Sequence, residues 1–322
     1  MKKIFKGQLY KQIPYNWDER TKGNPWLNSQ ILTSARNSNT PFLLVTHPRY
    51  CCCEYKQAFN IFSFGHLKLK IPFTVIAPPI SVDECGFVGD IEVLIEDYKN
   101  RKGMFLMLNI VPSIKPRHTV AIGKTLSTSI FDNKYKTYDE FLMSLRSSYR
   151  RRINKAKLKA SSLKWKEIEE NGFDEKIHDL YLNVLNRSKY PIETLGINFF
   201  KNIQGQIHVL YDNNMDPLAF VLIKWQNRNL HFLFGGMNYN KRDDFDLYYN
   251  MLLKILEIGI VGNAIKINLG QTAESSKCRV GCQLEEKYMI LFSGNKIVNL
   301  VARLFSKFLE YTPPKEKYHI FK

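Results

Sequence analysis

A short polar stretch that begins at Gly270 directly follows an apolar segment and holds the side chains best suited to chemistry. It reads Gly-Gln-Thr-Ala-Glu-Ser-Ser-Lys, so a carboxylate, an ammonium group and neutral hydrogen-bonding groups lie close together in the sequence. Glu274 can accept a proton, and Lys277 can hold a substrate carboxylate or phosphate. Gln271 and Thr272 can orient a bound molecule. The structural alternatives are a solvated acid, a salt bridge from Glu274 to Lys277, and capping of the loop backbone.

Further side chains could transfer protons or act as a nucleophile. His231 alternates with apolar residues on a predicted strand, and Tyr248 and Tyr249 lie on a predicted helix. A histidine titrates near neutral pH and a tyrosine hydroxyl can donate a proton. The alternatives are a structural histidine and core tyrosines with satisfied hydroxyl groups. Basic neighbours would lower the pKa of the Cys278 thiol if the side chain were exposed, but no base is evident as its partner.

Two strands and a buried helix must position these residues. Residues 243–260 are apolar on almost every side, which predicts a buried helix that is too short to span a bilayer. Residues 264–269 predict a strand that ends at Gly270, and residues 230–234 predict a strand before the helix. Open α/β sheets place their chemistry at the ends of such strands, so we expect the site there.

The remaining pattern predicts an α+β fold. Short apolar runs predict further strands at residues 41–46, 71–77, 104–111, 206–211, 218–225 and 287–292. Helical spacing predicts helices at residues 90–102 (with Asp90 as N-cap), 138–160, 177–188 and 198–203. Because the order of elements repeats weakly, we expect two similar domains in tandem, residues 1–130 and residues 131–322.

The densest basic block of the chain lies on the helix predicted at residues 138–160. Its cations are Arg146, Arg150, Arg151, Arg152, Lys155, Lys157 and Lys159, with no acid between them. Most of them lie off the apolar face, but Arg152 falls within it and therefore needs an anionic or carbonyl partner. The helix is either a solvated basic face or a binding site for phosphate or carboxylate groups, with Arg150 and Arg152 as candidate ligands.

Charge and composition limit the partners. With 47 Lys and Arg against 30 Asp and Glu, the formal charge of +17 favours nucleic acid, a phosphorylated cofactor or an acidic membrane surface, unless the protein is merely basic. No signal peptide or membrane-spanning stretch is visible, so we expect a cytoplasmic protein. The cysteines lack paired metal-ligand spacing, which favours inert thiols and no metal site. Residues 296–310 predict a basic amphipathic helix that closes a domain, with peripheral membrane contact as the alternative.

The order of elements from residue 138 onward resembles the GNAT superfamily of N-acyltransferases. More narrowly, it is similar to Fem-type aminoacyltransferases and to acyltransferase-like proteins associated with cellulose synthesis. Three segments carry the resemblance: the basic helix SLRSSYRRRINKAKLK, the strand–turn–helix LHFLFGGMNYNKRDDFDLYYNMLLKILEIG, and the strand and loop INLGQTAESSKCRVGC. It covers residues 138–292, whereas for residues 1–130 it depends on position and on the weak repetition of elements.

The resemblance implies transfer of an acyl or aminoacyl group to an amine. In that family two central strands of a mixed sheet splay apart and the acyl donor lies in the gap, here between the two strands predicted around the buried helix. For that reaction Glu274 is the candidate base, and Tyr248 and His231 are further candidates for proton transfer. The resemblance places the acceptor near residues 270–277. The donor would contact Phe234, Gly235, Gly236, Met237, Lys241 and Arg242.

The sequence departs from the family where phosphate is usually bound. Acetyltransferases have an Arg/Gln-x-x-Gly-x-Gly/Ala loop whose backbone N–H groups hold a pyrophosphate at a helix N-terminus. Here residues 240–246 contain no glycine. We expect Asp243, Asp244 and Asp246 in the first turn of the helix, where they would favour the helix dipole and repel a phosphate. Fem-type enzymes have likewise lost this loop and take their donor from aminoacyl-tRNA.

The leading interpretation is therefore an N-acyltransferase that uses acetyl-CoA or another acyl-CoA as a co-substrate and holds no cofactor tightly. The acceptor would be a small-molecule or lipid-linked amine, in cell-envelope or polysaccharide metabolism. Aminoacyl-tRNA is the alternative donor, and the charge of the chain fits either. Two other functions stay open: a non-catalytic binding module with a transferase fold, and a nucleic-acid-binding protein that uses the basic helix.

Overall fold

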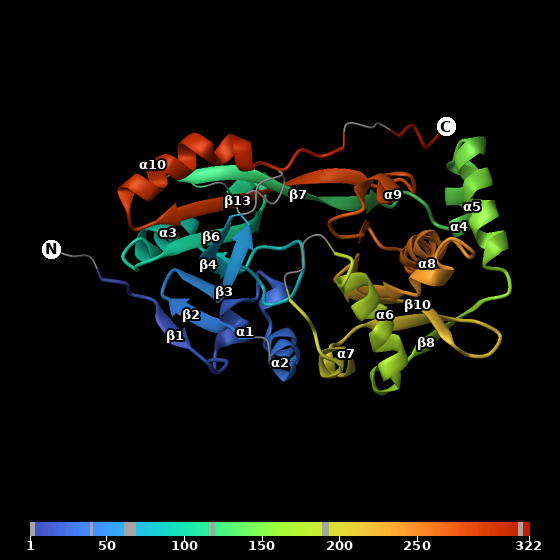
Figure 1. Ribbon diagram of the computed structural model, residues 1–322, viewed down its shortest axis with the longest axis horizontal. Helices are drawn as coiled ribbons and strands as arrows, with labels where there is room; N and C mark the ends of the chain where they lie inside the picture. The colour runs from blue at the N-terminus through green and yellow to red at the C-terminus, as the bar shows by residue number, and fades with distance from the viewer. Residues whose placement is uncertain are drawn as a thin grey trace. The chain divides into compact units, whose positions relative to one another are not determined.

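In the computed structural model of the protein, the chain forms two compact units (Figure 1). Unit 1 comprises Met1–Leu126 and Glu286–Pro313, and unit 2 comprises Ser127–Glu285 and Pro314–Lys322. The structure describes residues 4–38, 41–60, 69–114, 116, 120–188, 193–314 and 318–322. The division into domains at residue 130 stays a prediction.

Unit 1 is built on a sheet with the strand order β1-β2-β3-β4-β6-β13, with β5 paired to β3. The pair β4–β6 is parallel and the other pairs along this order are antiparallel. The strands are β1 (Gln8–Tyr10), β2 (Leu43–His47), β3 (Tyr50–Asn60), β4 (Lys70–Ile76), β5 (Phe87–Gly89), β6 (Met104–Ile110) and β13 (Gln283–Ser293), with the first half of β7 (Ala121–Asp132). The strands predicted at residues 41–46, 71–77 and 104–111 are therefore present.

Short helices accompany this sheet. They are α1 (Trp17–Arg20), η1 (Pro25–Leu27), α2 (Ser29–Asn37), α3 (Ile91–Tyr98), η2 (Pro112–Ile114), α10 (Lys296–Phe305) and η5 (Ser306–Leu309). Asp90 caps α3 as predicted, because its carboxylate accepts hydrogen bonds from the backbone N–H groups of Glu92 and Val93. The core includes Tyr98 and Phe105, which are fully buried and pack edge to face with ring centroids 5.2 Å apart.

Unit 2 contains the predicted antiparallel meander, extended by a parallel strand. The sheet order is β7-β12-β11-β10-β9-β8, and only β11 and β12 run parallel. Its strands are β8 (Lys164–Ile168), β9 (Gln206–Tyr211), β10 (Pro217–Gln226), β11 (Asn229–Met237) and β12 (Lys266–Asn268), with the second half of β7. Its helices are α4 (Tyr138–Ser144), α5 (Ser147–Lys159), η3 (Glu170–Gly172), α6 (Glu175–Leu185), α7 (Ile197–Asn202), η4 (Tyr239–Lys241), α8 (Leu247–Val261) and α9 (Glu274–Cys278).

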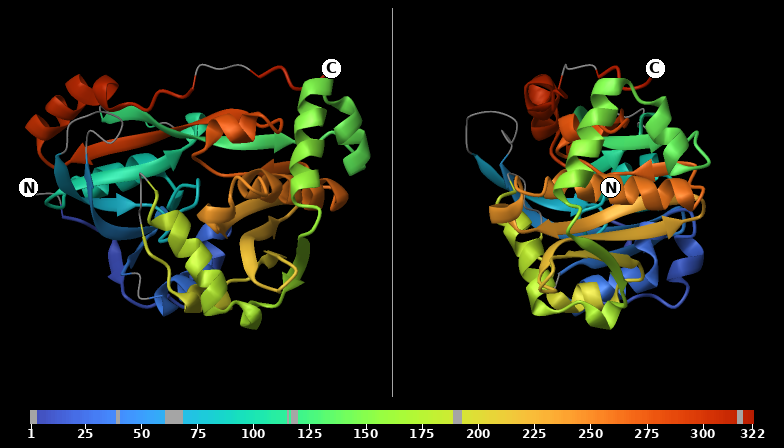
Figure 2. Two further views of the ribbon diagram at one scale, coloured as in Figure 1. Left: turned by 45° about the vertical axis from the view of Figure 1, so that its right-hand side comes forward. Right: turned by 90° about the vertical axis from the view of Figure 1, so that its right-hand side faces the viewer.

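Helices α6 and α8 cover opposite faces of this sheet (Figure 2). Successive residues of a strand point to opposite faces. A Cβ added at Gly235 would lie 2.6 Å from the side chain of Met251 on α8, whereas one at Gly236 would lie 2.4 Å from the backbone of Leu180 on α6. Both glycines therefore serve close packing of a helix on β11, and α8 is enclosed as its apolar surface predicted.

The helix predicted at residues 138–160 is two helices. Leu145, between α4 and α5, has an extended backbone with ψ 144°, and Arg146 begins the second helix as its N-cap. The C-terminal segment pairs at this point, because the backbone N–H of Arg146 donates to Ile320 at 2.9 Å and that of Lys322 donates to Ser144 at 3.0 Å. These bonds to a distant segment replace helical ones, so the continuous apolar periodicity did not reveal the break.

The prediction that three aspartates occupy the first turn of the buried helix is wrong. Helix α8 begins at Leu247, and Asp246 before it has a left-handed backbone with φ 47°. Asp243 and Asp244 lie in the preceding turn, in ion pairs with Arg242 (2.8 Å) and Lys241 (3.7 Å). Their charges are locally compensated.

The amphipathic helix predicted at residues 296–310 is α10 followed by η5, but it packs with the opposite face to the one we expected. Its buried residues are Asn299 and Ala302, whereas Ile297 and Leu304 are 72% and 66% exposed. The prediction that its apolar face closes a domain is therefore wrong for the described side chains.

Candidate functional site

The two strands expected to splay apart are β11 and β12. They pair in parallel over Asn229↔Lys266, Leu230↔Ile267 and His231↔Asn268, and there the pairing ends. Strand β11 continues to Met237 alongside β10, with a bulge that makes Leu233 the extra residue. A bulge bends and twists a strand. Beyond His231, the edge of β11 that faced β12 has no strand partner in the described part of the sheet, which leaves backbone groups for a ligand.

The loop that follows β12 has an unusual backbone. Gly270, Thr272 and Ala273 all have positive φ angles, 71°, 61° and 49°. Left-handed conformations cost about 1 kcal/mol or more at non-glycine residues and cluster at functional sites. The loop ends in α9, so that Glu274 and Lys277 lie on a short helix rather than in the loop that we predicted.

The buried side chain of Lys277 holds this loop in place through hydrogen bonds. Its ammonium group donates hydrogen bonds to the carbonyl oxygens of Gly270 (3.2 Å) and Gln271 (2.6 Å). Asn268 adds a third bond, since its side-chain oxygen accepts from the backbone N–H of Gly270 at 2.7 Å. The geometry therefore gives Lys277 a structural role in shaping the strand end.

Burial and charge make the thiol of Cys278 less acidic. Desolvation raises its pKa, the nearby carboxylate of Glu274 raises it further, and Lys277 only partly opposes these effects. The lowered pKa that we considered for an exposed side chain does not occur, which argues against a cysteine nucleophile. Glu274 itself is 3% exposed, at the start of α9.

His231 lies where the two strands part. It is opposite Asn268 in the last parallel pair, and its ring Nδ1 lies 3.4 Å from the side-chain amide nitrogen of Asn268. This places a titratable ring beside the unpaired edge of β11. Tyr248 differs, because it packs against the hydrophobic core of unit 2 and burial raises its pKa above the ordinary range.

A cavity of about 390 Å³ lies between α5, α8 and α9. It is lined by Ser148, Tyr149, Arg152, Tyr249, Ser276 and Arg279. Tyr249 is 8% exposed, and its hydroxyl has no hydrogen-bond partner among the described residues. Burial raises the pKa of Tyr249 to about 12, although the charges of Arg152 and Arg279 oppose the increase. A buried, unpaired hydroxyl beside two cations is a feature of a ligand site rather than of a closed core.

The two arginines of the cavity differ in how they are held. Arg152 lies over the ring of Tyr249 at 5.2 Å and 3.4 Å from Asp246, which supplies the anionic partner that its position requires. Arg279 lies over the ring of Tyr318 at 5.3 Å and forms no ion pair with any residue that the structure describes. Guanidinium groups from two facing helices suit a phosphate or a carboxylate.

The structure brings some of the predicted residues together and separates others. Arg152 lines the cavity but Arg150 does not. Lys241 and Arg242 are exposed and paired with neighbouring aspartates, so they point to no anion site of their own. No role for Ser148, Tyr149, Ser276 or Arg279 was predicted from the sequence, and Tyr248 was favoured over Tyr249. The adjacent cations of the segment Lys-Cys-Arg were the only signal, because the cavity depends on α9 packing near α5.

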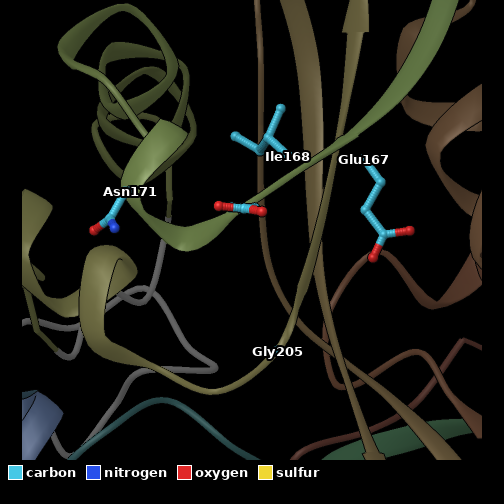
Figure 3. Close-up of a pocket in the computed structure, with 5 residues that line it drawn as sticks. Glu167, Ile168, Asn171 and Gly205 are labelled. Atoms are coloured by element: carbon cyan, nitrogen blue, oxygen red, sulfur yellow. The ribbon is translucent and has the colours of Figure 1, made fainter.

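A second cavity lies at the end of β8 and is acidic (Figure 3). It has a volume of about 470 Å³ and is lined by Glu167, Ile168, Glu169, Asn171 and Gly205. None of the predicted site residues lines it. Its two exposed carboxylates would repel a phosphate, so it is a poor site for the expected donor.

Solved structures show which fold this is. A domain assigned to a lysylphosphatidylglycerol synthetase from Agrobacterium fabrum has a TM-score of 0.55 and 10% identity, over 90% of this chain and 94% of its own. FemX has a TM-score of 0.55 and 12% identity, over 92% of this chain and all of its own. L-PGS from Bacillus licheniformis has a TM-score of 0.51 and 11% identity, over 86% of this chain and 96% of its own. The chain has the mixed α/β fold of these proteins.

No protein-family model and no curated protein matches the sequence. The structures therefore carry the comparison, and they confirm the resemblance to the Fem-type protein FemX at the level of fold. No helix among the described residues has the length and apolar content to cross a bilayer. In the same residues no group of three or more His, Cys, Asp or Glu side chains could hold a metal ion.

Proposed function

We propose that the protein is an acyltransferase that moves an acyl or aminoacyl group from a phosphate-bearing donor to an amine. The observation that carries the proposal is the cavity between α5, α8 and α9, with two arginines and the buried hydroxyl of Tyr249. The fold shared with FemX, with L-PGS and with a domain assigned to a lysylphosphatidylglycerol synthetase supports this reaction class. The donor's phosphate would lie against Arg152 and Arg279, and its acyl arm along the unpaired edge of β11.

The transfer requires that the acyl oxygen is stabilised, that the amine proton is accepted and that the leaving group is protonated. The amine nitrogen attacks the acyl carbon, and the bond to the donor's leaving atom breaks. Backbone N–H groups stabilise the acyl oxygen during this step, and the edge of β11 between Phe232 and Met237 can provide them. The amine proton passes to His231, in the last pair of β11 and β12, or to Glu274 at the start of α9. With an aminoacyl-tRNA donor, whose leaving ribose oxygen lies within one nucleotide of a phosphate, Tyr249 gives a proton to the leaving group, and its pKa of about 12 keeps it protonated at neutral pH. With an acyl-CoA donor, whose sulfur lies a pantetheine arm away from the phosphates, the leaving thiolate takes its proton from solvent.

Within this proposal the donor is an acyl-CoA. The corrected start of α8 removes one objection, because no acidic residue lies in its first turn. Aminoacyl-tRNA is the second candidate, and a specific feature favours it: the segment at residues 240–246 has no glycine with which to approach a pyrophosphate. Both donors carry the phosphates that two arginines bind, and the acceptor would be a small-molecule or lipid-linked amine.

Isothermal titration with CoA, acetyl-CoA and aminoacyl-tRNA tests the proposal. Arg152→Ala and Arg279→Ala should each weaken donor binding roughly tenfold or more, because each removes a charge-assisted contact. Arg151→Ala is the matched control, since Arg151 is an exposed arginine of the same helix that does not line the cavity. A steep salt dependence would identify aminoacyl-tRNA as the donor. The proposal fails if no donor binds or if all three variants behave alike, and binding without transfer would indicate the non-catalytic module.

A further inference from the structure

Helix α10 of unit 1 turns its apolar face to the solvent. Five of its side chains are 48–72% exposed: Ile297, Leu300, Val301, Leu304 and Phe305. With 3.6 residues per turn they fall within roughly 140° of the helix surface, which makes one continuous stripe. Single exposed apolar residues are ordinary, but a contiguous stripe of this kind marks an interaction surface.

Specific contacts fix this orientation. On the buried side, the Asn299 side chain donates to the carbonyl oxygen of Ser293 and accepts from its backbone N–H, both at 2.8 Å. Asn295 caps the helix through the N–H of Ile297. Gly294 lets the chain approach closely, because a Cβ there would lie 2.4 Å from the carbonyl oxygen of Lys99. A rotation that buried the apolar stripe would break the two buried hydrogen bonds of Asn299.

A row of cations borders the stripe on one side. Lys296, Arg303 and Lys307 are all exposed, and at helical spacing they fall on the same flank. The helix itself contains no Asp or Glu. An apolar stripe with a basic flank is the composition of helices that lie in the interface of a membrane.

We propose that α10 docks the protein peripherally on an anionic lipid surface. Its apolar stripe enters the boundary between headgroups and acyl chains to a depth of about 5–10 Å, and the basic flank contacts the headgroup phosphates. This surface lies on unit 1 and involves none of the residues assigned to acyl transfer. It would hold the protein at a membrane whichever donor or acceptor it uses.

Charge and width favour a lipid surface over a second copy of the chain. In a symmetric pair of α10 helices, cations would meet an interface that contains no acid on either helix. A pair of packed helices also needs only a narrow seam of apolar residues, and this stripe is wider. An anionic bilayer offers both an apolar layer and opposite charge.

Vesicle sedimentation tests the proposal with the full chain. Phosphatidylcholine vesicles with about 30% phosphatidylglycerol should bind the protein more tightly than pure phosphatidylcholine vesicles, by about fivefold for each cation engaged. The double variant Leu300→Gln/Leu304→Gln should lose roughly tenfold or more of this partitioning while keeping every charge. Arg303→Gln/Lys307→Gln should lower binding only to the anionic vesicles.

Val261→Gln is the matched control, because Val261 is 63% exposed at the end of α8 and lies outside α10. It should bind vesicles like the unchanged protein. The proposal is overturned if the unchanged protein does not bind anionic vesicles, or if Leu300→Gln/Leu304→Gln binds them equally well. It is also overturned if the unchanged protein self-associates without lipid and the only effect of the double variant is to abolish that self-association. Circular dichroism of each variant confirms that the fold is kept.

Discussion

At the scale of single residues, the hydroxyl of Tyr249 is the group whose chemistry is easiest to isolate. It is buried, it has no hydrogen-bond partner in the described structure, and both cavity arginines act on its pKa. If it protonates the leaving group, Tyr249→Phe should lower kcat by about 10²-fold or more and leave donor binding nearly unchanged. Removing an unsatisfied buried hydroxyl should not lower the melting temperature.

Tyr138→Phe is the control for this prediction. The hydroxyl of Tyr138 is also buried without a hydrogen-bond partner among the described residues, but it lies on α4 and does not line the cavity. Steady-state kinetics should show no change in kcat for this variant. Equal losses in both variants, or a loss in donor affinity alone for Tyr249→Phe, would contradict the proton-donor role.

At the scale of elements, the contact between α6 and β11 leaves no room for a side chain at Gly236. A Cβ there would lie 2.4 Å from the backbone of Leu180, and backbone atoms cannot move aside as a flexible side chain can. Gly236→Ala should therefore lower the free energy of unfolding by about 1–3 kcal/mol, measured by denaturant titration. Gly196→Ala is the control, because its added Cβ has no atom of the described residues within 4 Å, apart from its neighbours in the chain. An unchanged midpoint for Gly236→Ala would show that α6 is not packed closely on the strand.

The helices and strands that were predicted correctly are those whose buried residues follow the apolar periodicity of the local sequence. The strands at residues 206–211 and 218–225 are found where they were predicted, and the buried helix α8 is found there from Leu247 onward, because apolar runs and turn residues determine them locally. The break between α4 and α5 was missed because the bonds to residues 320–322 come from a distant part of the chain. The exposed stripe of α10 was missed because amphipathic periodicity shows that a helix has an apolar face but does not show what that face packs against.

The candidate site was predictable to the same extent. The sequence pointed to Arg152 as a cation in need of a partner and to the polar stretch after β12. It could not show that Lys277 turns inward to fasten that stretch, nor that Arg279 joins Arg152 at one cavity. Both facts depend on how α9 packs, and helices as short as α9 have too little pattern of their own to reveal it.

At the scale of the whole molecule, unit 1 is not a continuous piece of chain. Its last strand and helix come from Glu286–Pro313, far along the sequence from the rest of the unit. Strand β13 pairs with β6 from Tyr288↔Ile110 to Ser293↔Met104, and Phe292 packs on Phe105 with ring centroids 5.4 Å apart. A domain that stopped at residue 130 would lack these contacts.

We therefore expect a chain of residues 1–130 alone to show no cooperative thermal transition. It would lose a strand partner for β6 and two fully buried side chains, Ile290 and Phe292, and each loss of this size costs about 2–5 kcal/mol, comparable to the total stability of a small domain. Residues 1–126 joined to residues 286–313 by a short Gly-Ser linker should regain the transition, because that chain contains the whole of unit 1. Circular dichroism on heating distinguishes the two. If residues 1–130 alone unfold cooperatively at the same temperature as the linked chain, they form a complete domain, and the predicted division at residue 130 is correct.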